Sequence, residues 1–273
     1  MEKFSSMSTE QPVDHPFLAL AMEAVLMAGE LQMRHLGTDM RVSVKEGTDI
    51  VTEVDLEVEA VVRALIAERF PGHGILAEET AETLPSEGDA HRWLLDPIDG
   101  TVNYAHGLGI FCASLALEVD HTLEVAAVYD PSRRELFSAA RGLGAWLNGL
   151  PIAVSRVSHI RDAMVGVGFP HGATTRNRVL EGMFCEAAVQ ARGIRRLGSA
   201  ALDLCNVACG RLDGFWDMNL KPWDLAAGAL LVQEAGGTVT ALHGTPFSCH
   251  SGNVLASNGQ VHEHLQRIVL AAN

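Results

Sequence analysis

Hydrophobic residues near the start of the chain recur every three or four positions, which is the spacing of one face of an α-helix. The first such stretch covers residues 16–36, and Gly37 is placed to end it. The second covers residues 54–70 and ends at a Pro-Gly pair, and its expected buried side chains include Leu56. The pattern predicts two amphipathic helices, preceded by a polar stretch, residues 1–14, that we expect to be a flexible tail.

The middle of the chain carries short apolar runs separated by turn residues, and after Pro151 helical spacing alternates with short strands. This mixture predicts an α+β or layered α/β architecture. Because no repeat or low-complexity linker is present, we expect an N-terminal part, 15–150, and a C-terminal part, 151–273, to pack as one unit. The expected strands are 74–77, 93–95, 111–119, 123–129, 135–140, one near 194, 214–216, 238–240 and 254–256, and the expected later helices are 177–191, 200–210, 224–235 and 260–271.

Acidic residues outnumber basic ones, with 34 Asp and Glu against 20 Lys and Arg and a formal net charge of −14. Such a balance argues against binding to a nucleic-acid backbone or an anionic membrane. If the substrate is itself an anion, something other than the chain's side chains must supply positive charge.

The five cysteines are scattered and form no C-x-x-C pair, so they suggest neither a disulfide framework nor a zinc site and are expected to be small buried hydrophobes. No continuous apolar run reaches the roughly 18 residues that span a bilayer. The first apolar stretch contains Glu23 and has no basic leader, which argues against a signal peptide. We therefore expect a cytoplasmic protein.

The densest chemical signal is an apolar run, 93–95, that leads directly into Asp96-Pro-Ile-Asp-Gly-Thr101. Two carboxylates on a turn closed by Pro and Gly can converge on one hard cation, and the Ile98 carbonyl can join them, because Mg²⁺ prefers oxygen ligands. The same residues could instead form a plain surface turn, since Asp-Pro and Asp-Gly are common turn dipeptides.

Other acidic residues stand at similar positions. Glu78 follows the short apolar run 75–77, and Asp224 begins a helical pattern, where an Asp taken alone would be read as a cap. Lys45, Asp49 and Asp55 precede the second helix. Several acidic sites at strand ends and helix starts favour a metal site over unrelated turns.

With these residues in view, the chain resembles the inositol monophosphatase family, in the superfamily of Mg²⁺-dependent, lithium-sensitive phosphatases that includes fructose-1,6-bisphosphatases. The likeness covers about residues 16–271. It implies a sandwich of alternating αβαβα layers. The motifs that carry it are Asp96-Pro-Ile-Asp-Gly-Thr101, Trp223-Asp-x-Ala-Ala-Gly228 with Glu234-Ala-Gly-Gly237, the pair Glu78-Glu79, and the segment from Lys45 to Asp55.

The resemblance implies a role for each acidic residue. Glu78, Asp96 and the Ile98 carbonyl are similar to the ligands of a first Mg²⁺, and Asp96, Asp99 and Asp224 to those of a second, with a weaker third ion beside Glu78. Two divalent ions would supply the positive charge that a phosphate ester needs in an acidic protein.

The resemblance also implies direct in-line attack of a metal-activated water on phosphorus, without a phosphoenzyme. Thr101, Asp55 and Glu78 would orient and deprotonate that water, and the N–H groups of Gly100 and Thr101 would bind the phosphate together with Asp99.

For the substrate, Asp217 stands where the family has an acidic residue that accepts hydrogen bonds from ring hydroxyls, and Gly198-Ser199-Ala200 is similar to a second polyol-binding segment. Asp217 is one methylene shorter than the commoner Glu, and taken alone it could be a solvated carboxylate at a strand end. Val102, where several relatives carry Lys, favours myo-inositol 1-phosphate. Histidinol phosphate, fructose 1,6-bisphosphate and 3′-phosphoadenosine 5′-phosphate remain alternatives.

The expected partners are a small phosphorylated polyol and a second copy of the chain, since family members are usually homodimers. The basic pair Arg195-Arg196 is either solvated or directed at phosphate in its own or a neighbouring site. A non-enzymatic regulatory protein on the same fold is a further alternative, but it would have no need of the water-orienting Thr101 and Asp55.

Overall fold

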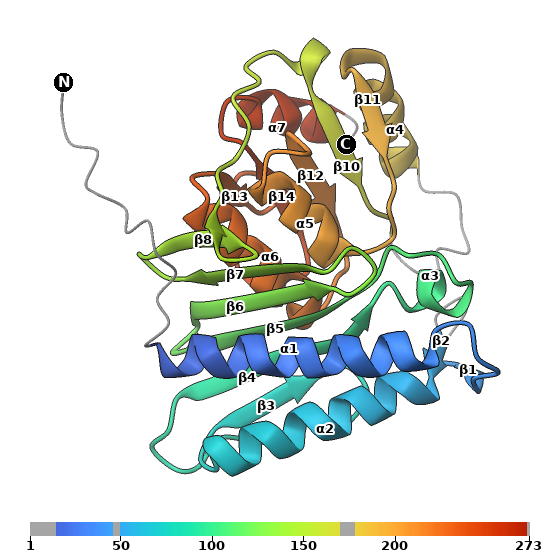
Figure 1. Ribbon diagram of the computed structural model, residues 1–273. Helices are drawn as coiled ribbons and strands as arrows, with labels where there is room; N and C mark the ends of the chain where they lie inside the picture. The colour runs from blue at the N-terminus through green and yellow to red at the C-terminus, as the bar shows by residue number, and fades with distance from the viewer. Residues whose placement is uncertain (1–14, 46–49, 170–177, 272–273) are drawn as a thin grey trace.

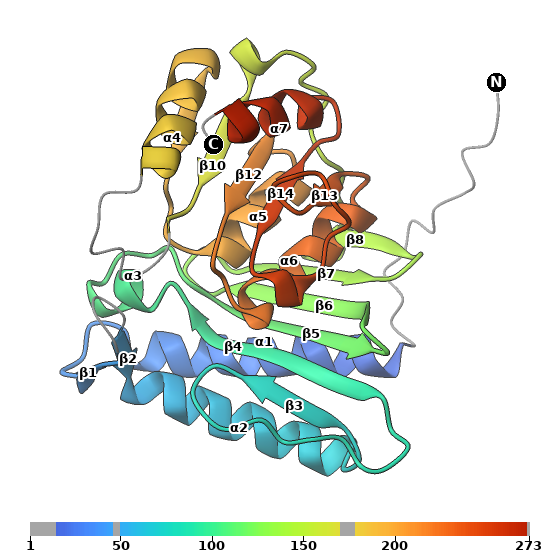
Figure 2. The same cartoon turned by 180° about the vertical axis from the view of Figure 1, so that it is seen from behind.

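The computed structural model describes residues 15–45, 50–169 and 178–271. Figures 1 and 2 show alternating layers: a helix pair, a seven-stranded sheet, a second helix pair, a five-stranded sheet and a third helix pair. This arrangement confirms the expected αβαβα sandwich. The expected tail, residues 1–14, lies outside the described residues.

The first helix layer consists of α1 (Pro16–His35) and α2 (Glu53–Arg69), which pack against each other and on the large sheet. Thr52 and Asp55 form a reciprocal capping box that begins α2. The helical pattern is confirmed, but the burial of Leu56 is not, since this side chain is 48% exposed. It lies two positions from Val54 and Val58 and therefore on another face of the helix.

Helix α1 is long and apolar enough, by length and composition alone, to cross a membrane, and it is the one such helix among the described residues. Half of that stretch is buried inside the protein. Its apolar face includes Leu18, Val25 and Leu31, which belong to the core cluster shared with α2 and the large sheet. The packing is that of a core helix.

The large sheet has the strand order β3-β4-β5-β6-β7-β8-β9. Its first two strands are parallel and the others pair antiparallel with their neighbours, as expected for short runs joined by tight turns. The strands are β3 (Gly74–Ala77), β4 (His91–Asp99), β5 (Cys112–Val119), β6 (Thr122–Asp130), β7 (Glu135–Ala140), β8 (Gly144–Leu147) and β9 (Leu150–Pro151).

The smaller sheet has the order β11-β10-β12-β14-β13, with β10 parallel to both of its neighbours. The pattern missed β10, where Gly166 interrupts a short apolar run, as well as β8, β9 and the hairpin β1 (Val42–Val44) and β2 (Ile50–Thr52). The strands of this sheet are β10 (Met164–Val167), β11 (Gly193–Arg195), β12 (Gly214–Asp217), β13 (Thr238–Thr240) and β14 (Val254–Ser257).

Helices α5 (Ala200–Ala208) and α6 (Pro222–Glu234) lie between the two sheets, and their side chains join residues of both sheets in one apolar cluster. The two helices approach closely at Gly228, where an added Cβ would lie 2.5 Å from the Cβ of Leu204. The outer layer is formed by α4 (Arg178–Gln190) and α7 (His262–Ala271), and short helices are α3 (Thr101–Ala105), η1 (Ile160–Asp162) and η2 (Cys249–Ser251).

The described cysteines are all unpaired. Cys112, Cys205 and Cys249 are buried, as expected for small hydrophobes, whereas Cys185 is exposed and Cys209 is only partly covered.

Candidate active site

The ladder between β4 and β5 is interrupted within the Asp-Pro-Ile-Asp motif. The pairing with β5 shifts register between Asp96 and Asp99. Pro97 has no N–H to donate, and the N–H of Ile98 donates instead to the Asp96 carboxylate at 2.9 Å. The Pro97 carbonyl accepts from the buried Gln32 amide at 2.7 Å. The Ile98 N–H and the Pro97 carbonyl are therefore both satisfied, one within the motif and the other by a side chain of α1.

Asp99 is held by the start of α5, about a hundred residues further along the chain. Its carboxylate accepts the Ser199 hydroxyl at 2.5 Å, the Ala201 N–H at 2.8 Å and the Ala200 N–H at 3.3 Å. Ser199 is also the N-cap of α5. The segment expected to contact a polyol, Gly198 to Ala200, thus contacts Asp99, and its contact with a polyol stays a prediction.

Thr101 begins α3 directly after Gly100, whose φ of +96° is a left-handed conformation. A Cβ at Gly100 would lie 2.9 Å from the Ile110 carbonyl oxygen, so the tight turn needs glycine here. The Thr101 hydroxyl donates to the Ile98 carbonyl at 2.9 Å and lies 3.3 Å from the Asp55 carboxylate. The expected pair of Thr101 and Asp55 is therefore in contact.

Asp55 is fully buried at the start of α2 and accepts from the N–H and hydroxyl of Thr52 at 2.8 and 2.5 Å. Burial raises its pKa to about 6, against these hydrogen bonds, which lower it, and the Glu78 charge raises it further. Asp55 is thus an acceptor near neutral pH that can also take up a proton.

Glu78 follows β3 and lies 2.8 Å from the Lys45 ammonium, which also pairs with Glu79 at 2.6 Å. Burial, together with the charges of Glu78 and Asp55, raises the pKa of Glu79 to about 7. Asp49, which the sequence placed beside Lys45, lies outside the described residues.

Sequence reasoning missed Glu59, a fully buried carboxylate on α2. Glu59 accepts from the N–H groups of Glu79 and Thr80 at 2.8 and 3.1 Å and is paired with Arg63 at 2.8 Å. It therefore fixes the turn that carries Glu78. An acidic residue inside the apolar face of a helix was the available signal.

The C-terminal part contributes Asp224 and Asp217. Asp224 accepts from the Lys221 N–H at 2.7 Å at the first turn of α6. It therefore caps this helix, as the sequence alone suggested. Asp217 ends β12, is 6% exposed and accepts from the Met218 N–H at 2.7 Å. It is thus not a solvated carboxylate. Burial raises its pKa to about 7, although the Arg196 charge lowers it.

The electrostatics of Asp96, Asp99 and Asp224 are those of an uncompensated anionic cluster. Burial raises the pKa of each, and the Glu78 charge raises it further. The Asp99 charge adds to the rise at Asp96 and Asp224, whereas the hydrogen bonds from the start of α5 act against the rise at Asp99. Within the described ranges none of the three forms an ion pair with a basic side chain. A hard divalent cation with oxygen ligands fits this donor set.

Outside the acidic cluster, two groups of side chains of the metal-ligand type lie close together in the part of the chain that the structure describes. In each of them a ligand atom already has a partner in the protein. In one, the Trp93 indole donates to a histidine Nδ1 at 3.0 Å. In the other, the Arg92 guanidinium lies 2.6 Å from the central carboxylate. These groups are His73, Asp89 and His91, and Glu118, Cys249 and His250.

Comparison with known proteins gives a consistent picture. Residues 14–272 match the model of the inositol monophosphatase family. An inositol-1-monophosphatase from Synechocystis is 40% identical over 97% of this chain and 94% of its own length. The Nus factor SuhB of Escherichia coli K12 is 41% identical over 90% of this chain and 93% of its own length. The solved structure of the extragenic suppressor protein suhB from Bartonella henselae superposes with a TM-score of 0.89 at 35% identity, covering 93% of this chain and 98% of that one.

Proposed function

The chain belongs to the inositol monophosphatase family, and from this premise we propose that it is a Mg²⁺-dependent phosphomonoesterase that hydrolyses myo-inositol 1-phosphate to inositol and phosphate. The observation that carries the proposal is the cluster of Asp96, Asp99 and Asp224, of which Asp96 and Asp99 are buried and none has a basic partner among the described residues, beside the hydrogen-bonded pair of Thr101 and Asp55. Uncompensated charge at a buried site is costly unless a ligand neutralises it.

The residues that would hold Mg²⁺ are all oxygen donors. Glu78, Asp96 and the Ile98 carbonyl would hold one ion, Asp96, Asp99 and Asp224 a second, and a third, weaker ion would lie beside Glu78. When bound, the ions neutralise the phosphate ester and lower the pKa of water near phosphorus. Asp99 would take this role with its carboxylate held by donors at the N-terminus of α5.

Thr101 and Asp55 are suited to orient the attacking water. The single proton of the Thr101 hydroxyl lies within reach of the Ile98 carbonyl at 2.9 Å and of the Asp55 carboxylate at 3.3 Å. With either acceptor, the oxygen lone pairs are left to accept from water. Because the pKa of Asp55 is raised only to about 6, its carboxylate is mostly ionised at neutral pH and keeps the hydroxyl in this orientation.

The polyol end of the substrate is assigned to Asp217, whose remaining carboxylate oxygen can accept from a ring hydroxyl. An added Cβ at Gly168 would lie 1.6 Å from this carboxylate, so the position of Asp217 depends on a glycine opposite it.

The experiment is phosphate release measured with Mg²⁺ across a panel of phosphomonoesters: myo-inositol 1-phosphate, histidinol phosphate, fructose 1,6-bisphosphate and 3′-phosphoadenosine 5′-phosphate. We expect the highest kcat/KM for inositol 1-phosphate, inhibition by lithium, and no activity with a metal chelator. If another ester is preferred, the proposed substrate is wrong but the proposed phosphatase activity stands. No release from any ester would favour the alternative, a regulatory protein on this fold, which the relatives named Nus factor SuhB bring into view.

A further inference from the structure

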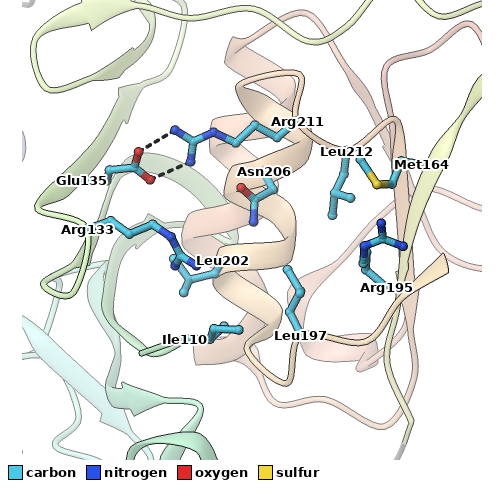
Figure 3. Close-up of a pocket in the computed structure, with 10 residues that line it drawn as sticks. All are labelled: Ile110, Arg133, Glu135, Met164, Arg195, Leu197, Leu202, Asn206, Arg211 and Leu212. Carbon is cyan, nitrogen blue, oxygen red and sulfur yellow. Dashed lines mark hydrogen bonds and ion pairs between the residues drawn. The ribbon is translucent and has the colours of Figure 1, made fainter. Parts of the chain in front are cut away.

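A second pocket lies between the large sheet and the C-terminal part, away from the acidic cluster. It has a volume of about 460 Å³, within the range of about 300–1,000 Å³ that is usual for small-molecule sites. Figure 3 shows Arg133 and Arg195 on opposite sides, with Leu202 and Asn206 of α5 between them. None of the proposed metal ligands lines this pocket.

The chemistry of the pocket differs from that of the acidic protein around it. Three guanidinium groups line it, but two are matched: Arg211 pairs with Glu135 at 2.5 and 2.6 Å, and Arg133 with Asp130 at 2.6 Å. Arg195 donates only to the backbone carbonyl of its own strand and has no carboxylate partner among the described residues. Its charge is therefore available to an anion.

The rest of the lining is largely apolar and includes Leu197 and Leu202 beside the Asn206 amide. An inorganic ion would leave these apolar side chains uncovered. An organic anion with a flat or aliphatic body would cover them while its charged end meets Arg195. The lining thus selects an amphiphilic anion rather than a free phosphate ion.

The segment from Arg195 to Leu202 connects this pocket to the active site. Arg195, Leu197 and Leu202 line the pocket. Between them, Ser199 and Ala201 donate to Asp99 at 2.5 and 2.8 Å. Asn103, next to the catalytic turn, donates to the Leu197 carbonyl at 2.8 Å. A ligand in the pocket would therefore contact the same segment that carries the donors to Asp99.

We propose that this pocket is an effector site for a small organic anion with an apolar body, and that its occupation strengthens Mg²⁺ binding by fixing the segment that orients Asp99. By linkage, Mg²⁺ strengthens binding in the pocket by the same factor. The existence of the pocket ligand does not depend on the proposed function, whereas its effect on the metal site rests on it.

The first experiment uses 8-anilinonaphthalene-1-sulfonate as the probe, because it is an anion with an apolar aromatic body. Fluorescence titration of the wild type should give one saturable site, and R195Q should weaken binding at least fivefold. The matched control R34Q removes the same charge from an exposed position in the last turn of α1, away from this pocket, and should stay within twofold of wild type. Equal binding by wild type and R195Q, or an equal loss in R34Q, overturns the site. Probe binding that disappears as protein concentration rises also overturns it, because the pocket would then be covered by a second copy.

The second experiment measures Mg²⁺ affinity by calorimetry with and without saturating probe. We expect at least threefold tighter Mg²⁺ binding with probe in the wild type and no change in R195Q. Unchanged or weaker Mg²⁺ binding overturns the coupling while leaving the pocket site intact. Failure of the proposed function has a different signature: Mg²⁺ binds and responds to the probe, but no phosphate is released.

Discussion

Strands β4 and β5 carry a buried carboxylate at each end of their pairing, and the two are treated in opposite ways. Near one end Glu118 lies opposite Arg92, and near the other Asp96 lies opposite Ser114. Both acidic residues are 2% exposed. Glu118 accepts from Arg92 at 2.6 Å and from His250 at 2.8 Å, and although burial acts to raise its pKa, these contacts hold it below the usual range. Burial and neighbouring carboxylates raise the pKa of Asp96.

Equal burial with opposite charge balance separates a structural carboxylate from a functional one. A protein that needed Asp96 only for stability would gain by pairing it, because an uncompensated buried charge lowers the free energy of unfolding. The cluster around Asp96 carries that cost, which is expected where a bound cation supplies the missing charge. At Glu118 the chain supplies the charge itself.

The largest expected effect is that of D96N. The amide oxygen can still accept from the Ile98 N–H, so the turn is preserved, but the anionic ligand is lost. We expect kcat with saturating Mg²⁺ to fall by about 10³-fold, which corresponds to about 4 kcal/mol in the barrier. The metal-free thermal midpoint should stay equal or rise, because one uncompensated charge is removed. Activity within tenfold of wild type would contradict the assignment of Asp96 to the metal site.

E118Q should show the reverse pattern. Removing this charge leaves Arg92 without its buried partner, and because Arg92 is itself 23% exposed at its side chain, we expect a loss of about 2 kcal/mol rather than the full cost of a broken buried pair. Urea unfolding measures the loss, and phosphate release should stay within about twofold of wild type. An E118Q variant that keeps the stability of the wild type but has lost its phosphatase activity would contradict the distinction between Glu118 and Asp96.

The acidic turn could be predicted from the sequence because its signals are local. An apolar strand followed by Asp-Pro and Asp-Gly identifies Asp96 and Asp99 without any knowledge of distant contacts. Their environment could not be predicted from spacing. The donors to Asp99 and the partners of Glu118 come from segments far along the chain, so only the packed layers reveal which carboxylate is matched.

The fold shows the same division between local patterns, which the sequence reveals, and distant contacts, which it does not. Long periodic stretches predicted α1, α2 and the helices of the C-terminal part within a few residues, because helical spacing repeats over many positions. Strand β10 was missed because four residues with a central Gly166 carry no clear alternation. Gly166 and Gly168 are explained only by what they face, since Cβ atoms there would meet the carboxylates of Asp203 and Asp217.

The pH dependence of stability extends the comparison to Asp217. Its folded pKa of about 7 lies above the ordinary value of 3.8, so its contribution is fully present below about pH 4 and is lost as pH rises through 7. In metal-free protein the unfolding free energy of wild type relative to D217N should fall by about 2 kcal/mol between pH 5 and 8. The pH dependence of stability at Glu118 has the opposite sign. Its folded pKa lies below the ordinary value, so its contribution to stability is present above the ordinary pKa and is lost as pH falls. Parallel curves for wild type and D217N would show that Asp217 is not held in this environment.

The smallest expected effect is that of E59Q, which tests a compensated carboxylate beside the proposed metal site. Glu59 pairs with Arg63 and fixes the backbone of Glu79, so the amide weakens a turn without removing any proposed ligand. We expect Mg²⁺ affinity, measured by calorimetry, to fall about threefold with kcat within twofold at saturating Mg²⁺, because Glu78 is positioned less firmly but still present. R63Q should reproduce the effect, since it removes the other partner of the same ion pair. If E59Q instead abolished activity at saturating Mg²⁺, Glu59 would belong with Asp96, and charge compensation would no longer distinguish supporting carboxylates from those that bind the metal.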